Sequence, residues 1–479
     1  MRNQKGQILI HVLILTAVGG IFIAVISSLA LQTLESIGRG FAGEQSIQIA
    51  EAGVEYYRWH LAHDPQDFQN GTEVPGPYII PFYDKDNVQI GDIVLDIEVL
   101  GESESAVRIT STGILTEDPS AQRTIEVILA KPSLARFAVV ANDAINFGPG
   151  TEVFGPIHSN GGIRFDGYAH NLITSAQSQY NDPDHSGQDE FGVHTHVDPL
   201  DPLPPASVPD RPDVFLAGRD FPVPAIDFEG ITADLATIKT EAQASGLYFG
   251  ASGVFGYEAV VKIDDTIDIY KVNSLIPKPS GCSSEIADSD WGIWSIQTST
   301  IVGNYLIPEN GLVFFEDDVW VRGKINTEQV TIAAARFPEN PARLKSITVN
   351  NDLLYTNYDG QDTIGLIAQG DINVGLYSED NLRIDAAIIA KSGRVGRYYY
   401  RAQEEPQNFC GDEAFRDTIQ LYGMLVTNER YGFSWTCSGT YCSGYANRIL
   451  TFDGNLKLNP PPGFPLTAQE FEVVLWQEK

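Results

Sequence analysis

The residues best suited to hold a metal ion lie in an acidic stretch near the middle of the chain. Asp182, Asp184 and Ser186 alternate ahead of Gly187. This spacing matches the start of a calcium loop, in which closely spaced oxygen ligands surround a hard cation. The Glu that closes an EF-hand loop is missing, because Val193 stands at its position. The stretch therefore has the beginning of a calcium loop without its end.

Histidines beside this stretch widen the range of metals that it could bind. His185, His194 and His196 are close in sequence, and His194-Thr-His196 on a strand would place both rings on one face. Imidazole and carboxylate ligands together suit a transition metal. The competing interpretation is a solvated acidic loop in an acidic protein. Apart from calcium, we expect no cofactor.

The four cysteines can form two disulfides. Cys437 and Cys442 bracket a short segment that contains a Gly, and a separation of five residues can be closed by a disulfide in an oxidising compartment. Cys282 and Cys410 could form a second bridge between distant parts of the chain. Buried free thiols are the alternative for both pairs.

Catalytic signatures are missing from the sequence. There is no Gly-x-Ser-x-Gly motif and no phosphate-binding loop. Asp317, Asp318 and Asp362 could act on polysaccharide in a groove, and Tyr398 to Tyr400 could stack on sugars. In a chain with 63 acidic residues and 10% aromatics, structural roles explain these residues better. We therefore expect that the protein is not an enzyme.

The composition describes a large acidic body behind a short basic start. The chain has 479 residues, with 31 Lys and Arg against 63 Asp and Glu, which gives a net charge of −32. Such a surface repels phosphate backbones, so nucleic-acid binding is not expected. Ahead of Glu35, the first acidic residue, the only charged residues are Arg2 and Lys5.

A long helix is predicted at the N-terminus. The segment from Ile8 to Leu31 is apolar except for His11, and it is long enough to cross a bilayer. Arg2 and Lys5 should keep the N-terminus in the cytoplasm. Helical spacing continues beyond the apolar segment, and Asp64-Pro65 should end the helix. The apolar stripe expected on its second half consists of Ile49, Ala52, Tyr56 and Trp59.

This arrangement resembles the type IV pilins and the related type II secretion pseudopilins. In that family a basic leader ends in Gly, a prepilin peptidase cuts after it, and the new N-terminal residue is methylated; Gly6 and Gln7 fit these places. The sequence Ala-Glu-Ala-Gly at 50–53 resembles the helix of PilX-like minor pilins. The resemblance covers about the first 65 residues and extends at most over the next 65. An ordinary membrane anchor, or a signal-peptidase site at 28–30, are the alternatives.

One position departs from the family pattern. Pilins usually carry Glu at the fifth position after the cut, where this chain has His11. Some minor pilins placed at the filament tip also lack this Glu, so His11 favours a minor, tip-located subunit over the major pilin. The alternative is that His11 is tolerated drift. Gly19 and Gly20 lie in the same apolar segment and are assigned with His11 to membrane insertion and assembly.

The remainder of the chain is predicted to be mainly β. Alternating apolar residues at 91–100, 106–115 and 123–130 predict a small antiparallel sheet of the pilin type. From about residue 134, short strands separated by Gly, Asn or Asp predict a large right-handed parallel β-helix-like solenoid, with a β-sandwich as the alternative. The expected organisation is a leader at 1–6, a transmembrane and amphipathic helix at 7–64, a pilin-like β head at 65–133, a β-solenoid at 134–460 with an insertion at about 175–300, and a C-terminal strand or tail at 461–479.

Together these features predict a non-enzymatic minor pilin or pilus-associated surface protein that displays its β-helical domain for adhesion or filament priming. The implied partners are other pilin subunits, the inner-membrane assembly machinery, the prepilin peptidase, the membrane, and a surface glycan or protein ligand. We expect a single-pass inner-membrane protein with a cytoplasmic N-terminus, displayed later on an extracellular filament or the cell surface. The alternative is a membrane-anchored β-helix protein that binds or degrades extracellular polysaccharide.

Overall fold

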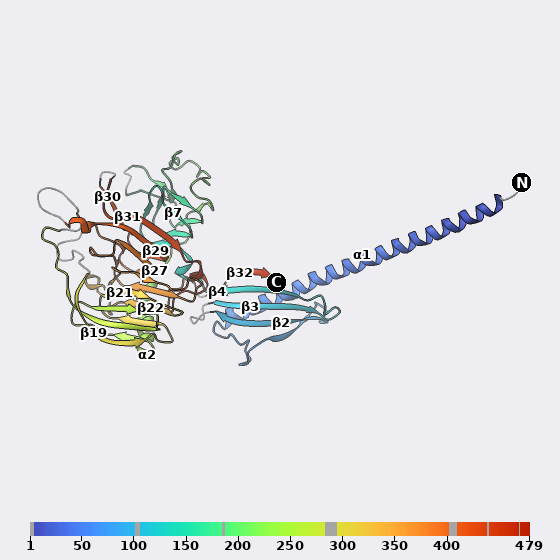
Figure 1. Cartoon of the computed structure of the whole chain (residues 1–479), viewed down its shortest axis with the longest axis horizontal. Coiled ribbons are helices and arrows are strands. Elements are labelled where there is room, and N and C mark those ends of the chain that lie inside the picture. The colour runs from blue at the N-terminus through green and yellow to red at the C-terminus, as the bar shows by residue number, and fades with distance from the viewer. Residues whose placement is uncertain are drawn as a thin grey trace. The chain divides into compact units, whose positions relative to one another are not determined.

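The computed structural model describes residues 4–100, 106–183, 187–282, 295–401, 410–437, 440–468 and 470–479. These residues form two compact units. Unit 1 comprises residues 1–99, 106–130 and 470–479, and unit 2 comprises residues 100–105 and 131–469. Figure 1 labels the elements of both units.

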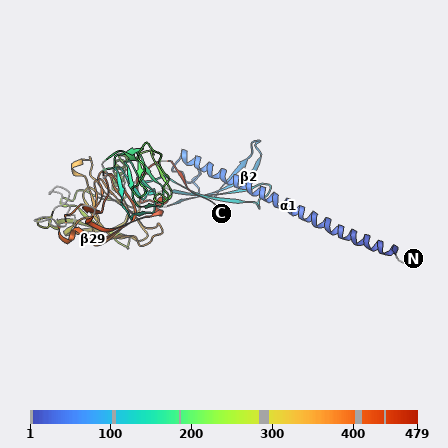
Figure 2. The ribbon, with the colours of Figure 1, turned by 90° about the horizontal axis from the view of Figure 1, so that it is seen from above.

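Unit 1 is built on one helix, α1 (Gln4–His63), which has 60 residues. Its first half projects beyond the sheet of this unit (Figure 2). The helix ends one residue before Asp64-Pro65, as predicted, because Pro disfavours helical geometry at the residue before it. Its second half packs on the sheet through a buried row that consists of Ser46, Ile49, Ala50, Val54, Tyr57 and Leu61.

The sheet of unit 1 has five antiparallel strands in the order β1-β2-β3-β4-β32. The three strands predicted from alternating residues are all present. The fifth strand comes from the far end of the chain and pairs with β4 at the edge of the sheet. The strands are β1 (Tyr78–Tyr83), β2 (Gln89–Leu100), β3 (Ala106–Leu115), β4 (Arg123–Ala130) and β32 (Glu472–Glu478).

Two glycines allow α1 to approach this sheet closely. A Cβ atom at Gly53 would lie 2.3 Å from Ser111 Oγ and 2.5 Å from Ile93 Cγ2. A Cβ atom at Gly113 on β3 would lie 2.0 Å from the Ser46 carbonyl oxygen of α1. Any larger residue at either position would force the helix and the sheet apart.

Unit 2 contains a long row of parallel strands that mixes early and late parts of the chain. Each strand pairs in parallel with the next in the row. The row therefore joins β29, late in the sequence, to β5, near the start of the unit. In spatial order it consists of β16 (Leu247–Phe249), β20 (Leu312–Phe315), β22 (Gln329–Ala334), β25 (Thr363–Ala368), β27 (Asn381–Ala390), β29 (Phe415–Thr427), β5 (Val139–Ala141), β8 (Ile157–Ser159), β11 (Ile173–Ser175) and β15 (Arg219–Asp220).

Shorter parallel rows accompany this one. The second row consists of β17 (Tyr257–Val261), β21 (Val319–Lys324), β23 (Ile347–Thr348), β26 (Ile372–Asn373) and β28 (Val395–Gly396), and β24 (Leu353–Leu354) bridges β21 and β27. The others are β6 (Ile145–Phe147) with β9 (Ile163–Phe165) and β14 (Val193–His194), and β7 (Glu152–Val153) with β10 (Tyr168–Ala169). Their inward-facing side chains form one large apolar core.

Antiparallel pairs and short helices complete unit 2. The antiparallel pairs are β12 (Gln179–Tyr180) with β13 (Glu190–Phe191), β17 with β18 (Thr266–Leu275), β18 with β19 (Ile296–Leu306), and β30 (Ser434–Cys437) with β31 (Thr440–Phe452). Helix α2 (Gly230–Ala244) buries Ile231, Leu235, Ile238 and Ala242 in a second core. The 3-10 helices are η1 (Leu134–Arg136), η3 (Pro341–Arg343), η4 (Gly411–Ala414) and η5 (Gly454–Lys457).

The protein is therefore mainly β, with a long N-terminal helix, a five-stranded antiparallel sheet and a large, mostly parallel sheet. Winding of the parallel strands into a right-handed solenoid stays a prediction. Residues 175–300, expected as an insertion, supply β15, β16 and β17 to the parallel rows. Because β15 and β16 are the end strands of the long row, residues 175–300 also connect its two ends.

The close helix–sheet contact predicts opposite effects for two glycine substitutions in α1. Gly53→Ala should destabilise the packing by about 1–3 kcal/mol, because its Cβ atom overlaps Ser111 and Ile93. Gly40→Ala, whose Cβ atom has no neighbour within 4 Å among the described residues, should stabilise α1 by about 0.5–1 kcal/mol. Hydrogen exchange of the β3 amides, measured in the detergent-solubilised full chain, compares the effects of the two substitutions. Equal exchange rates in the two variants would contradict the packing argument.

Candidate metal centre and anchoring helix

The residues assigned to processing and to membrane insertion and assembly lie on the projecting half of α1. Gly6, Gln7, His11, Gly19 and Gly20 are all helical. The helix from Leu9 to His63 contains a window with a mean hydropathy of 2.7, none of which is buried within the protein. By length and composition it could cross a membrane, although signal sequences near an N-terminus have the same properties.

The histidines predicted as metal ligands come together with two carboxylates in unit 2. Asp182 follows β12, Glu190 begins β13, His194 ends β14 and His196 follows two residues later. One ligand atom from each of the four residues lies within 4.8 Å of the other three. Asp184, His185 and Ser186 lie outside the described residues.

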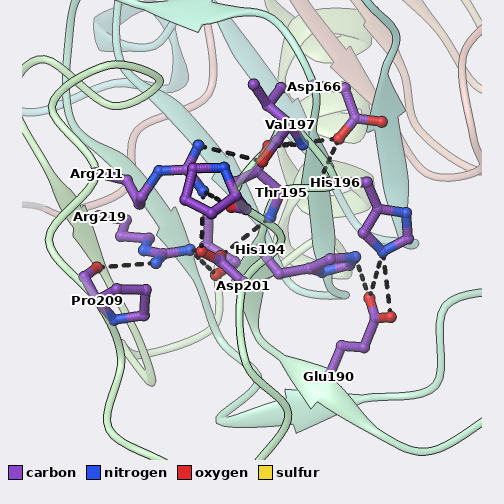
Figure 3. A network of polar contacts seen from close by, with 12 residues as sticks. Asp166, Glu190, His194, Thr195, His196, Val197, Asp201, Pro209, Arg211 and Arg219 are labelled. Carbon is purple, nitrogen blue, oxygen red and sulfur yellow. Dashed lines mark hydrogen bonds and ion pairs between the residues drawn. The ribbon is translucent and has the colours of Figure 1, made fainter.

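Glu190 is the centre of these contacts. The Nε2 atom of His196 lies 3.2 Å from Glu190 Oε1, and the Nε2 atom of His194 contacts Glu190 Oε2 (Figure 3). The same His194 nitrogen is 3.7 Å from Asp182 Oδ2. The two imidazole rings are neighbours, with centroids 5.1 Å apart. The sequence prediction missed Glu190, because no spacing distinguishes it from the other acidic residues around it.

Burial affects the protonation of His194 in this cluster. Asp182 is 3% exposed, Glu190 4% and His194 2%. Burial lowers the pKa of His194, and the negative charge of Glu190 only partly opposes this effect. Burial and the charge of Asp182 together raise the pKa of the neighbouring Tyr180. The imidazole of His194 is therefore favoured in its neutral form, which is the form that ligates metals.

Hydrogen bonds hold the backbone that carries the two histidines. The His196 N–H donates to Asp166 Oδ1 at 2.7 Å, and the Thr195 N–H donates to Asp201 Oδ2 at 3.2 Å. The Val197 N–H donates to the Thr195 hydroxyl at 3.1 Å. Two buried carboxylates thus determine the course of the chain from 194 to 197, as Figure 3 shows.

Asp201 also connects two buried arginines. It accepts hydrogen bonds from Arg219 Nη1 and, at 3.4 Å, from Arg211 Nη1. Arg211 also pairs with Asp213 at 2.7 Å, and this hydrogen bond, together with Asp201, raises the pKa of Arg211. Arg219 donates to the Pro209 carbonyl at 3.0 Å. The network connects the proline-containing segment from Pro199 to Pro209 to β14, which carries His194.

The structure contains both disulfides. Cys282 bonds to Cys410 across 128 residues of sequence, and Cys437 at the end of β30 bonds to Cys442 in β31. The first pair is buried with Leu376, Tyr400 and Ala414 in a small apolar cluster of its own.

The acidic residues considered for polysaccharide chemistry have structural partners. Lys345 Nζ contacts Asp317 Oδ1 at 2.8 Å and Asp318 Oδ2 at 3.0 Å. Asp362 is buried and accepts backbone N–H bonds from Thr327, Thr356 and Asn357.

The three tyrosines considered for sugar stacking are likewise engaged. Tyr400 is buried, the hydroxyl of Tyr398 donates to Asp371, and Tyr399 contacts Cys437.

Comparisons with known proteins are sparse. No protein-family model and no curated protein matches the chain. Among solved structures, the chain is similar to the competence-associated pilin ComZ from Thermus thermophilus, with 12% sequence identity and a TM-score of 0.30. The match covers 91% of this chain and 97% of the ComZ chain. A TM-score of this size does not establish a common fold or function, so no role is transferred from ComZ.

The arginine network predicts a large cost for removing its shared carboxylate. Asp201→Ala should destabilise unit 2 by about 3–5 kcal/mol, because it leaves the buried guanidinium of Arg219 without its ion-pair partner and weakens that of Arg211. Asp210→Ala is the matched control, since Asp210 is exposed on the same stretch. Urea unfolding of both variants tests this; equal midpoints would contradict a stabilising role for Asp201.

Proposed function

We propose that this chain is a type IV pilin-like minor subunit that acts through assembly and display rather than catalysis. The observation that carries the proposal is the division of α1. From Leu9 to Phe41 its large apolar side chains are exposed, whereas its second half packs on an antiparallel sheet. Helix α1 thus consists of an exposed apolar half and a half that is part of a folded head.

The uncovered half of α1 needs an apolar environment. An exposed hydrophobic surface of this length is not stable in water and must be covered by lipid or by other apolar helices. Both environments belong to the proposed pathway. The subunit first resides in the inner membrane with its N-terminus in the cytoplasm, and then enters a filament whose core consists of such helices.

The partners follow from this pathway. A prepilin peptidase would cut after Gly6 and expose Gln7 for methylation, and the assembly machinery and other pilin subunits would contact the helix around His11, Gly19 and Gly20. Unit 2, proposed to wind as a parallel solenoid, would be displayed outside the cell for adhesion to a glycan or protein, or for filament priming.

Processing after Gly6 is the decisive test. Mass spectrometry of the protein from its native host should give Gln7, methylated, as the first residue. A Gly6→Val variant should keep its leader and stay in the membrane fraction, while Gly19→Ala should be cut normally. An intact Met1 would indicate an ordinary membrane anchor, and a start at Leu31 would indicate a secreted protein without an anchor. Either result would overturn the proposed function.

His11 should determine where the subunit sits in a filament. A subunit at the tip has none above it whose N-terminal amine needs a carboxylate. His11→Glu should therefore allow incorporation within the shaft and raise the amount of this protein per filament. His63→Glu, an exposed change at the other end of α1, should leave that amount unchanged. Quantitative immunoblotting of sheared filaments measures it, and identical amounts in both variants would exclude a positional role for His11.

A further inference from the structure

The four residues at the end of β12, in β13 and around β14 have the donor set of a metal site. Two imidazoles and two carboxylates present one ligand atom each within 4.8 Å of one another. Ligands at about 2.1 Å from a tetrahedral zinc ion lie roughly 3.4 Å apart. Side-chain movements of about 1 Å would therefore bring Asp182, Glu190, His194 and His196 onto one ion.

Their burial requires a compensating positive charge. Asp182 and Glu190 are both nearly inaccessible to solvent, and buried carboxylates are stable only when they are paired or coordinate a metal. Arg164 lies near Asp182, with Nη1 3.8 Å from Oδ2, but its Nε atom donates to Asp166 at 2.7 Å. A divalent cation would add positive charge to the same group of buried carboxylates.

His194 supplies an independent observation that points into the same space. It is 2% exposed, and neither of its ring nitrogens makes a hydrogen bond within the part of the chain that the structure describes. Its Nε2 atom faces the oxygens of Glu190 and Asp182. The Nε2 atom is thus in contact with Glu190 Oε2 without hydrogen-bond geometry, and coordination to a cation would give this buried nitrogen and that carboxylate a shared ligand.

The surroundings of the cluster hold it in place before any ion binds. Asp166 and Asp201 anchor the backbone on either side of Thr195, and β14 pairs in parallel with β9. The pairing of β12 with β13 positions the other two ligands. Ligands held by rigid strands and by outer hydrogen bonds are typical of metal sites rather than of mobile acidic loops.

The donor chemistry selects the class of metal. Calcium takes six to eight oxygen ligands, whereas half of the described donors here are imidazole nitrogens. Two nitrogens with two carboxylate oxygens suit zinc and neighbouring divalent transition metals. Four protein ligands also fill a tetrahedral shell, as in structural rather than catalytic zinc sites.

We propose that Asp182, Glu190, His194 and His196 bind one structural zinc-class divalent ion, which fastens the β12–β13 pair to β14. The ion would bring together ligands that span fifteen residues of sequence and stabilise this end of unit 2. The proposal is independent of the filament role, since it concerns residues far from α1 in sequence and would hold for any anchored or secreted form.

The test uses the full chain in detergent, purified without a polyhistidine tag and stripped of metal with a chelator. Titration with Zn²⁺ in a calorimeter should show one ion bound per chain, and the melting temperature of unit 2 should rise. Ca²⁺ at the same concentrations should give neither effect. Mass spectrometry of the native complex, which is independent of stability, should show the mass of a single zinc ion.

Zinc binding by single variants distinguishes the histidines of the cluster from a histidine outside it. His194→Ala and His196→Ala should each weaken zinc binding about 100-fold, whereas His170→Ala should bind normally, because His170 pairs with Glu152 outside the cluster. His196 is the safer substitution, since its side chain is 22% exposed and its loss should leave the core intact. Folding of each variant is checked by its circular dichroism spectrum.

Three outcomes would overturn the proposal. The first is stripped protein that takes up no stoichiometric zinc, and the second is a His196→Ala variant that binds zinc as tightly as the native chain. The third is binding of Ca²⁺ that is lost in Asp182→Asn and unchanged in His196→Ala, which would indicate an all-oxygen site.

Discussion

The backbone of α1 lies directly against β3 because Gly53 and Gly113 present no side chains at the point of contact. This steric constraint fixes which face of the helix is buried, and so which residues form the core of unit 1. The large apolar side chains on the other half of α1 are exposed in the part of the chain that the structure describes. Helix α1 thus has one half that packs tightly on the sheet and one half that is exposed and apolar. The proposed anchoring and assembly follow from the exposed half.

The same contact explains where sequence reasoning succeeded and where it was wrong. The existence of α1, its end before Pro65, and the strands β2 to β4 could be predicted, because periodicity and proline are local signals. The predicted stripe placed Tyr56 and Trp59 in the core, but both are exposed. The buried face is instead centred on Gly53. Gly has a low helix propensity and no apolar side chain, so a search for apolar residues at helical spacing does not place it in the core.

Unit 2 shows the limit of local signals more strongly. Many of its strands, such as β25 and β27, were predictable as short apolar runs, but their spatial order was not, because β29 pairs with β5 across nearly three hundred residues of sequence. For the candidate metal centre, Asp182, His194 and His196 were identifiable from spacing. Glu190 was not, because one acidic residue among many gains meaning only when the β12–β13 pairing turns it toward the histidines.

The position of β32 has a consequence for the order of events during synthesis. This strand completes the sheet of unit 1, yet the ribosome reaches it only after all of unit 2 has been made. Until then β4 has an unpaired edge, and such edges recruit other strands. The first unit to be translated is therefore the last to be finished, and a nascent chain must shield that edge while several hundred residues of β structure emerge behind it.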